Sequence, residues 1–438
     1  MRVAGLTRWQ WTTIASLTVG YMGYYFCRSN LSVAGPLLLD AYGDEGFTKE
    51  SFGMIATVGV GFYTVGKLFN GVICDFVGGR RMFLIGMAGA ILCTFAFSVG
   101  TGYTFFVSVW AVNRLVQSAG WGGLVKTAAH WFPSSMVGTV LGLLCLSYLF
   151  GDVIARLFLG QLIEWGADWR QVFWAAGGIV TVILILELIF LRPNPEAVGE
   201  ESPVAHPENL FGHDGNASRP ASVIALLTPF FRSVSFWLIC LISFGLTLIR
   251  ETFNFWTPTY LNEVAQLSPG RAALASSLFP FFGGISVVLI GLLSDRLTDG
   301  RRGLMMVVFL IPAVAVLFLL SLQDETSSAT LQVTLISLTG LLILGPYALL
   351  TGALSVDLGG KQGSATAAGM ADTAGYVGGM VSGWGIGTIA TRWGWSGAFA
   401  FLACVLAVTT VLTTIYWYVH DVRSSASRDA VSDASGRA

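Results

Sequence analysis

Long apolar segments recur along almost the whole chain, and they constrain its fold more than any other feature. A helix needs about 20 mostly apolar residues to cross the hydrocarbon of a bilayer, because each residue rises ~1.5 Å. Such windows occupy Trp11–Leu39, Phe52–Val77, Met82–Val99, Tyr103–His130, Val137–Ile163, Val172–Leu191, Val234–Leu261, Ala272–Leu293, Leu304–Leu322, Leu331–Val356, Ala365–Ala390 and Ala398–Tyr418. Only 11% of the residues are charged, against about 25% in soluble proteins. The sequence therefore predicts an all-α membrane protein with twelve transmembrane helices.

Two polar stretches predict the domain organisation. Residues 193–232 contain prolines and charges without apolar periodicity, which is typical of a flexible linker. We expect a six-helix bundle over residues 1–192, a second over 233–420, and a disordered tail over 421–438. With both termini in the cytoplasm, fourteen Lys and Arg residues face inward and four outward. Because basic residues are more frequent on the cytoplasmic side of a membrane, this distribution predicts that both termini are cytoplasmic. We expect the protein in the cell's inner membrane.

The two halves are repeats of one another. The segment GVICDFVGGRR, with Asp75, Arg80 and Arg81, recurs as GLLSDRLTDGRR. The second copy carries Asp295, Arg301 and Arg302. The repeat predicts two pseudo-symmetric bundles, an arrangement in which transporters place a site at the membrane midplane. We expect these charges, at cytoplasmic helix ends, to act as conformational latches.

Two arginines stand at matching depth in the two halves. Arg28 and Arg250 each lie about seventeen residues into an apolar window, too deep to reach either membrane surface easily. A guanidinium stays charged when desolvated and offers forked N–H donors, which predicts a site for an anion such as phosphate. Glu251 follows Arg250 directly, but neighbouring residues on a helix point about 100° apart. We therefore do not expect Glu251 to be an obvious partner of that arginine, and assign it to charge balance.

Other polar residues within the windows leave alternatives open. Lys67 is near mid-depth of the second window and either faces the anion or pairs with an acid. Asp152 and Arg156 are spaced i,i+4, so they form a buried pair or Arg156 contacts the substrate. Asp372 either balances one of the cations or helps to select the substrate. Four tyrosines have hydroxyl groups that could donate hydrogen bonds to the anion: Tyr24, Tyr25, Tyr148 and Tyr376.

The motifs resemble those of the major facilitator superfamily. GVICDFVGGRR is similar to its loop motif, and RLVQSAG to its fourth-helix motif. The segments YYFCRSN, GFYTVGKLFNGVICD, GWGGLVKTAAHWF and RETFNFWTPTYLNEV resemble the organophosphate:phosphate antiporter family. The resemblance implies that Arg28 and Arg250 hold the phosphate, that Lys67 is a further cation of the pathway, and that Tyr24, Tyr25 and Tyr376 line the cavity. Tyr148, Ser29 and Phe255 depart from the glycerol-phosphate branch, which puts glycerol-3-phosphate itself in doubt.

The leading interpretation is a secondary transporter that exchanges an organophosphate, or a phosphonate-like anion, for inorganic phosphate by alternating access. The alternatives are a proton- or sodium-coupled organic anion symporter and a non-transporting membrane sensor of a sugar phosphate. The sequence contains no P-loop, metal-ligand cluster or nucleophile with a base at interpretable spacing, so we expect no enzyme, cofactor or bound metal. The expected partners are a small anionic substrate and the lipid bilayer, without nucleic acid, and we expect a monomer.

Overall fold

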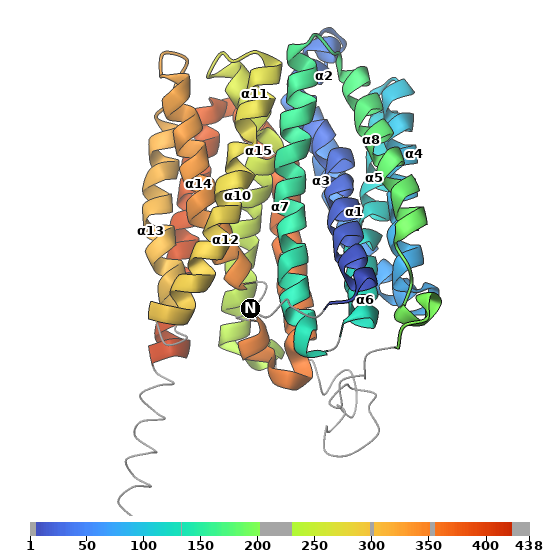
Figure 1. The fold of residues 1–438 in the computed structure, drawn as a ribbon. Helices are drawn as coiled ribbons and strands as arrows, with labels where there is room; N and C mark the ends of the chain where they lie inside the picture. Colours follow the sequence, from blue (N-terminus) through green and yellow to red (C-terminus); the bar gives the residue numbers. More distant parts are fainter. Residues whose placement is uncertain (1–5, 133, 202–229, 298–301, 351–354, 423–438) are drawn as a thin grey trace, which may run out of the picture. The chain divides into compact units, whose positions relative to one another are not determined.

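The structure is a computed structural model of the chain, and it describes residues 6–132, 134–201, 230–297, 302–350 and 355–422 (Figure 1). Contacts between residues divide the chain into two compact units. The first unit comprises Met1–Ser218 with Asn254–Pro280, and the second Arg219–Phe253 with Phe281–Ala438. Most of the predicted linker and nearly all of the predicted tail lie outside the described ranges. The predicted domain boundaries therefore stay a prediction.

The first half of the chain forms helices that begin at well-defined caps. Thr7 and Asp168 each close a capping box, and the Thr48 side chain accepts a hydrogen bond from Ser51 N. The helices are α1 Arg8–Val33, α2 Gly35–Tyr42, α3 Lys49–Val77, α4 Gly79–Val99, α5 Tyr103–Gln117, α6 Ala119–Trp131, α7 Ser134–Glu164 and α8 Trp169–Phe190. Short 3₁₀ turns, η1 Gly43–Glu45 and η2 Pro195–Val198, follow α2 and α8. Helix α1 packs against α7 and α8, and α4 packs against α5, α6 and α8 (Figure 1).

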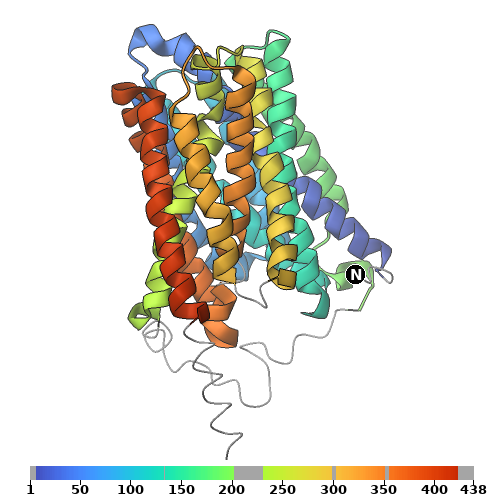
Figure 2. The same cartoon turned by 90° about the vertical axis from the view of Figure 1, so that its left-hand side faces the viewer.

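The second half is helical in the same way. Its helices are α10 Val234–Glu263, α11 Pro269–Ser276, α12 Leu278–Leu297, α13 Arg302–Ser321, α14 Ala329–Leu349 and α15 Ser355–Tyr416, followed by a π-helical turn, η4 Trp417–Val422. Helix α13 packs against both α14 and α15, the orange and red helices of Figure 2. Apart from residues 351–354, which lie outside the described ranges, the predicted apolar windows lie, to within a residue or two, inside one helix or a pair of consecutive helices.

Helix α15 contains the last two predicted windows, which we expected as separate helices. A straight helix of 62 residues would be about 93 Å long, three times the hydrocarbon thickness. Gly394 has a φ of +70°, which only glycine adopts readily, and it turns the chain between the two windows. Within the described residues, eight helices are long and apolar enough to cross a membrane, with α11 and α12 forming one of them. Counting α15 twice and adding α1–α2, α3 and α5–α6 gives the twelve predicted spans.

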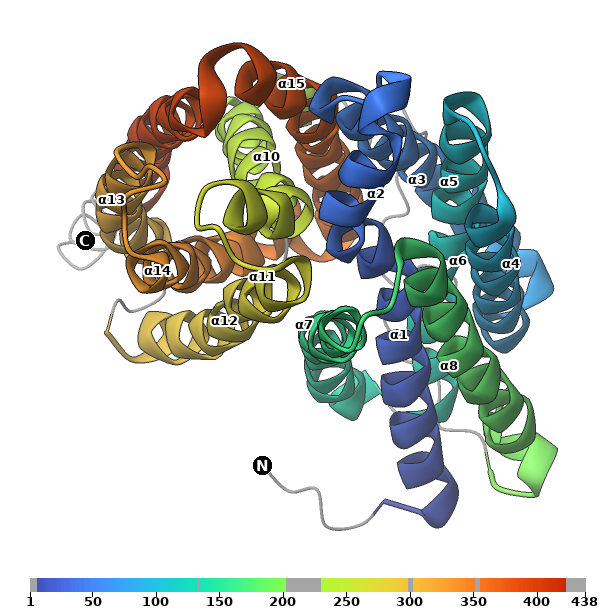
Figure 3. The same ribbon diagram turned by 90° about the horizontal axis from the view of Figure 1, so that it is seen from above.

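Helix α10 is divided between the two units. Its residues up to Phe253 belong to the second unit, and Asn254–Pro280, which contains the internal Pro258, belongs to the first. This segment includes α11, which packs against α7 (Figure 3). A Cβ added at Gly160 of α7 would lie 2.9 Å from Leu274 N, so glycine is what allows this close approach. The ion pair Lys49–Glu263, at 2.8 Å, fastens the end of α10 to α3.

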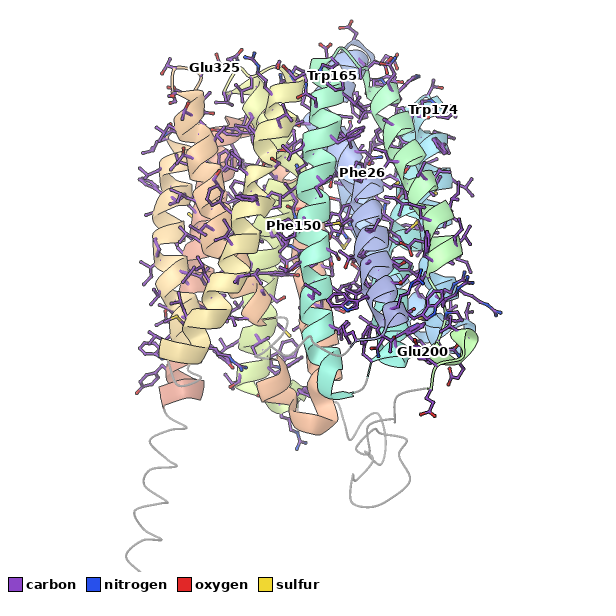
Figure 4. All side chains as sticks on the ribbon, in the orientation of Figure 1. Phe26, Phe150, Trp165, Trp174, Glu200 and Glu325 are labelled. Atoms are coloured by element: carbon purple, nitrogen blue, oxygen red, sulfur yellow. The ribbon has the colours of Figure 1, made fainter. Side chains whose placement is uncertain are left out.

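The surface of the first unit is apolar. Figure 4 shows the Phe150 and Trp174 side chains pointing away from their helices, and both are about half exposed, at 45% and 51%. Single exposed apolar residues are ordinary in soluble proteins, but here they cover long helices along their length. This surface suits contact with lipid, as the composition predicts.

Candidate functional site

Three basic side chains of the first unit gather around one buried tyrosine. The ring centroid of Tyr63 lies 4.9 Å from Arg28 Cζ, 4.7 Å from Arg114 Cζ and 5.5 Å from Lys67 Nζ. Three different helices position the cations: α1 carries Arg28, α5 carries Arg114, and α3 carries Lys67 one turn after Tyr63. The aromatic face attracts each cation, typically by about 0.5–2 kcal/mol. We call Arg28, Tyr63, Lys67 and Arg114 the Tyr63 cluster.

The charge of the Tyr63 cluster favours an anion. Tyr63 and Arg114 are buried, whereas Arg28 and Lys67 are half-buried, so water screens the three cations only in part. Like charges in such a place repel one another, and a bound anion would offset that repulsion. Arg114 is also held by Gln117, whose Oε1 accepts from Arg114 Nη1 at 3.4 Å. Gln117 Nε2 in turn donates to Cys27 O at 2.9 Å, which ties the cluster to α1.

Tyrosines extend the Tyr63 cluster along α1 and α7. Arg28 Cζ lies 5.3 Å from the Tyr25 ring centroid, and Tyr25 stacks on Tyr148 with centroids 6.4 Å apart. Tyr25 and Tyr148 are partly exposed, so this edge of the cluster is accessible. The buried Tyr24 instead donates its hydroxyl hydrogen bond to Phe83 O of α4. Of the two neighbouring tyrosines of α1, Tyr25 therefore has the geometry expected of a substrate contact.

Arg250 lies in the second unit and has two close neighbours. Its Nη2 is 2.6 Å from Glu251 Oε1, so the expectation that Glu251 is not its partner was wrong. The Cβ atoms of adjacent helical residues do diverge, but both side chains are long enough to bend toward each other. Arg250 Cζ also lies 4.3 Å from the ring centroid of Tyr347 on α14. On α15, Tyr376 is buried and Asp372, one turn earlier, is half-buried.

Asp152 and Arg156 form the buried pair that was one of the two predicted alternatives. Arg156 Nε is 3.0 Å from Asp152 Oδ1, and the arginine is 2% exposed. Ser29 of α1 donates a hydrogen bond to the same carboxylate. Arg156 Nη1 donates to Ser276 Oγ at 3.0 Å, and Nη2 donates to Asn254 O at 2.6 Å. The guanidinium thus uses all three nitrogens on protein groups, which favours a structural role over substrate contact.

The Asn254 carbonyl needs these donors because of Pro258. In an α-helix the carbonyl of residue i accepts from the N–H of residue i+4, and proline has no N–H. Asn254 O therefore lacks its helical donor, and an unsatisfied carbonyl at membrane depth costs several kcal/mol. Arg156 supplies one hydrogen bond, and Ser32 Oγ of α1 supplies another at 3.0 Å. We call Asp152, Arg156, Ser32 and Asn254 the proline clamp.

The predicted latch residues are described only in part. Arg80 donates from Nε to Leu191 O at 2.6 Å and from Nη2 to Leu188 O at 3.1 Å, which caps the end of α8. Arg81 is exposed, and Arg302 begins α13. The side chains of Asp75 and Asp295, and the whole of Arg301, lie outside the described residues. Their role as latches stays a prediction.

Three residues around the cations were not among the predicted site residues. Tyr63 could have been noticed as the tyrosine one helical turn before Lys67. Arg114 could have been noticed as an arginine within an apolar window. Tyr347 follows a helix-kinking proline, but nothing in its sequence context points to Arg250. Among the described residues, no group of three or more His, Cys, Asp and Glu side chains could hold a metal ion.

The chain belongs to the Major Facilitator Superfamily, which it matches over residues 17–383. It is a transporter-family protein and not an enzyme. Two solved structures share the fold with a TM-score of 0.71, at 14% and 13% identity. One is a bacterial homologue of the human lysosomal transporter Spinster, with 95% of this chain and 97% of that chain covered. The other is the nucleoside transporter NupG, with 92% and 99% covered.

The relatives that this chain resembles in sequence are consistent with membership of the organophosphate:phosphate antiporter family. The probable hexose phosphate transport protein of Chlamydia trachomatis is 28% identical over 91% of this chain and 89% of its own length. The glycerol-3-phosphate transporter of Bacillus subtilis is 27% identical over 90% of each chain. The membrane sensor protein UhpC of Salmonella typhimurium is 24% identical over 92% of this chain and 90% of its own length.

Proposed function

We propose that this protein exchanges a sugar phosphate or a related organophosphate for inorganic phosphate by alternating access. The observation that carries the proposal is the Tyr63 cluster, where three cations meet around a buried tyrosine. Relatives described as hexose phosphate and glycerol-3-phosphate transporters support the substrate class. We further propose a monomer in the inner membrane with both termini in the cytoplasm, on the distribution of basic residues.

The proposed roles follow from the chemistry of each side chain. Arg28 offers a planar fork of donors to the phosphate, held in place by the Tyr25 and Tyr63 rings. Lys67 adds a point charge. Arg250 takes the role of Arg28 in the repeated half, since the two lie at corresponding positions of the repeat. Tyr148 extends the aromatic edge, and Tyr376, Asp372 and Glu251 stay candidates for contact with the organic part or for charge balance.

Transport by purified protein in liposomes tests the proposal. Vesicles loaded with inorganic phosphate should take up labelled hexose 6-phosphate or glycerol 3-phosphate, and vesicles loaded with chloride should not. Uptake driven by an imposed pH gradient without internal phosphate would instead support a proton-coupled symporter. The measurement needs protein-free vesicles as the control for leakage.

A membrane sensor is the second candidate function, because UhpC relatives match nearly the whole chain. A sensor would bind the sugar phosphate without moving it. Binding measured by a rise in melting temperature, together with no uptake under any loading condition, would favour this candidate over exchange.

A further inference from the structure

A basic cavity lies at one end of the first unit, apart from the Tyr63 cluster. Its volume is about 430 Å³, within the range of small-molecule sites. The described lining comes from the α3–α4 junction, the last turns of α6 and the segment after α8: Val77, Gly78, Gly79, Arg80, Arg81, Lys126, His130, Pro193 and Asn194. Four of these residues are basic and none is acidic. The predicted orientation places this end at the cytoplasmic face, at the lower end of the first unit in Figure 1.

The basic side chains are partly fixed before any ligand arrives. Arg80 is held by the two carbonyls at the end of α8, which leaves Nη1 as its remaining nitrogen. Lys126 and His130 are one helical turn apart and share a face of α6. His130 Nδ1 lies 2.7 Å from Lys126 O, so a ring that donates there has Nε2 left, and Nε2 donates to a phosphate when the ring is an imidazolium. Arg81 is exposed and also lines the cavity.

The backbone adds donors at the same place. Helix α4 begins at Gly79, and its N-cap residue, Gly78, has a φ of +93° and no side chain to cap the first turn. The N-cap residue thus supplies no side-chain acceptor to the N–H groups of the first turn, and the helix N-terminus carries partial positive charge. Backbone donors and cationic side chains on one cavity wall are the combination that binds phosphate groups.

We propose that this cavity binds a phosphate group, separately from the transported substrate. The cavity is larger than a phosphate ion, so it also accommodates the headgroup of an anionic glycerophospholipid at the membrane surface. Basic pockets at the ends of membrane helices attract such headgroups. Free phosphate or a phosphate monoester has the same chemistry. Either ligand would link the α3–α4 junction to α6 and to the segment after α8, and so would stabilise this end of the unit.

Two binding measurements distinguish the lipid headgroup from the soluble phosphate as the ligand of this cavity. Native mass spectrometry of the purified protein counts bound phosphatidylglycerol, with phosphatidylcholine as the zwitterionic reference. A melting-temperature titration with inorganic phosphate tests the soluble ligand. That titration uses the Arg28→Gln background, so that the Tyr63 cluster is disabled. The test variant is Arg81→Gln/His130→Gln, because both side chains are exposed and their loss should not affect folding. The control is Arg8→Gln, an exposed arginine at the start of α1 that does not line the cavity.

The double variant should lose at least about tenfold in affinity for one of the two ligands, while Arg8→Gln changes it less than about twofold. Loss of phosphatidylglycerol adducts identifies the lipid headgroup, and loss of the phosphate-induced shift identifies the soluble anion. Equal binding of both ligands by the double variant and the control would overturn the proposal, provided that their melting temperatures without ligand agree. Binding that disappears equally in both variants would also overturn it.

Discussion

At the scale of single residues, the geometry of the guanidinium should matter more than its charge. Arg28 lies against two aromatic rings and can offer two parallel donors to a phosphate. We expect Arg28→Lys to abolish most exchange, because lysine keeps the charge and loses the fork. The measurement is phosphate-driven uptake in liposomes at matched protein amount. Lys67→Ala should be less damaging, and wild-type exchange by the Arg28→Lys variant would contradict the assignment.

Tyr63 gives a second prediction at this scale. Its ring faces three cations, so the aromatic face should matter more than the hydroxyl group. Tyr63→Phe should keep most of the substrate affinity, whereas Tyr63→Leu should lose about 1–2 kcal/mol, or roughly tenfold, since leucine has no π-face. Affinity would be measured by half-saturation of exchange. The prediction fails if the two variants are equally impaired, because the hydroxyl would then be the group that matters.

At the scale of helices, the proline clamp links the segment of α10 before Pro258 to α1 and α7. Pro258 leaves the Asn254 carbonyl without its helical donor, and Arg156 replaces that donor. Arg156→Met should destabilise the protein by about 3–5 kcal/mol, because it leaves Asp152 as an uncompensated buried charge. Adding Pro258→Ala to the Arg156→Met variant should recover part of the lost stability, because alanine restores an N–H donor for the Asn254 carbonyl.

A double-mutant cycle measures this coupling through melting temperatures in detergent. The combined Arg156→Met/Pro258→Ala variant should lose about 1–2 kcal/mol less free energy of unfolding than the sum of the two single changes predicts. Pro312→Ala, at the internal proline of α13, is the matched control and should show no coupling to Arg156. Additive effects at both prolines would mean that Arg156 acts only through Asp152.

At the scale of the whole molecule, the three neighbouring cations predict how fast a transporter without bound substrate changes from one membrane face to the other. The Tyr63 cluster brings three cations together, and in the proposed alternating-access cycle the cavity around them closes and loses water before it opens on the other side. A bound phosphate offsets that charge, so it should lower the barrier to reorientation. Counterflow with phosphate on both sides should therefore exceed net efflux into phosphate-free buffer by at least about tenfold, or ~1.4 kcal/mol of barrier. Equal rates would favour a symporter, whose empty form returns readily.

The number and position of the spans, and the depth of Arg28 and Arg250, follow from the amino-acid sequence alone. Bilayer thickness sets the length of an apolar window, so the windows can be counted along the chain, and the depth of an arginine is its distance from the start of its window. Pro36 and Pro258, each eight residues after one of these arginines, fit the same repeat. Two consecutive apolar windows show that the chain must turn between them, and the left-handed backbone at Gly394 is where it does so between the last two.

Only the tertiary structure decided which side chains meet. Tyr63 is the point where three helices bring their cations together, and that depends on how each helix is rotated about its axis. Periodicity in a helix that is apolar on most sides does not fix this rotation. The pairing of Arg250 with Glu251 depends on side-chain conformation. Asp152 as a partner of Arg156 follows from their i,i+4 spacing, but a further partner is a backbone carbonyl that a proline 102 residues away leaves without its donor. Such partners leave no pattern in the sequence, because they arise where separate helices come into contact.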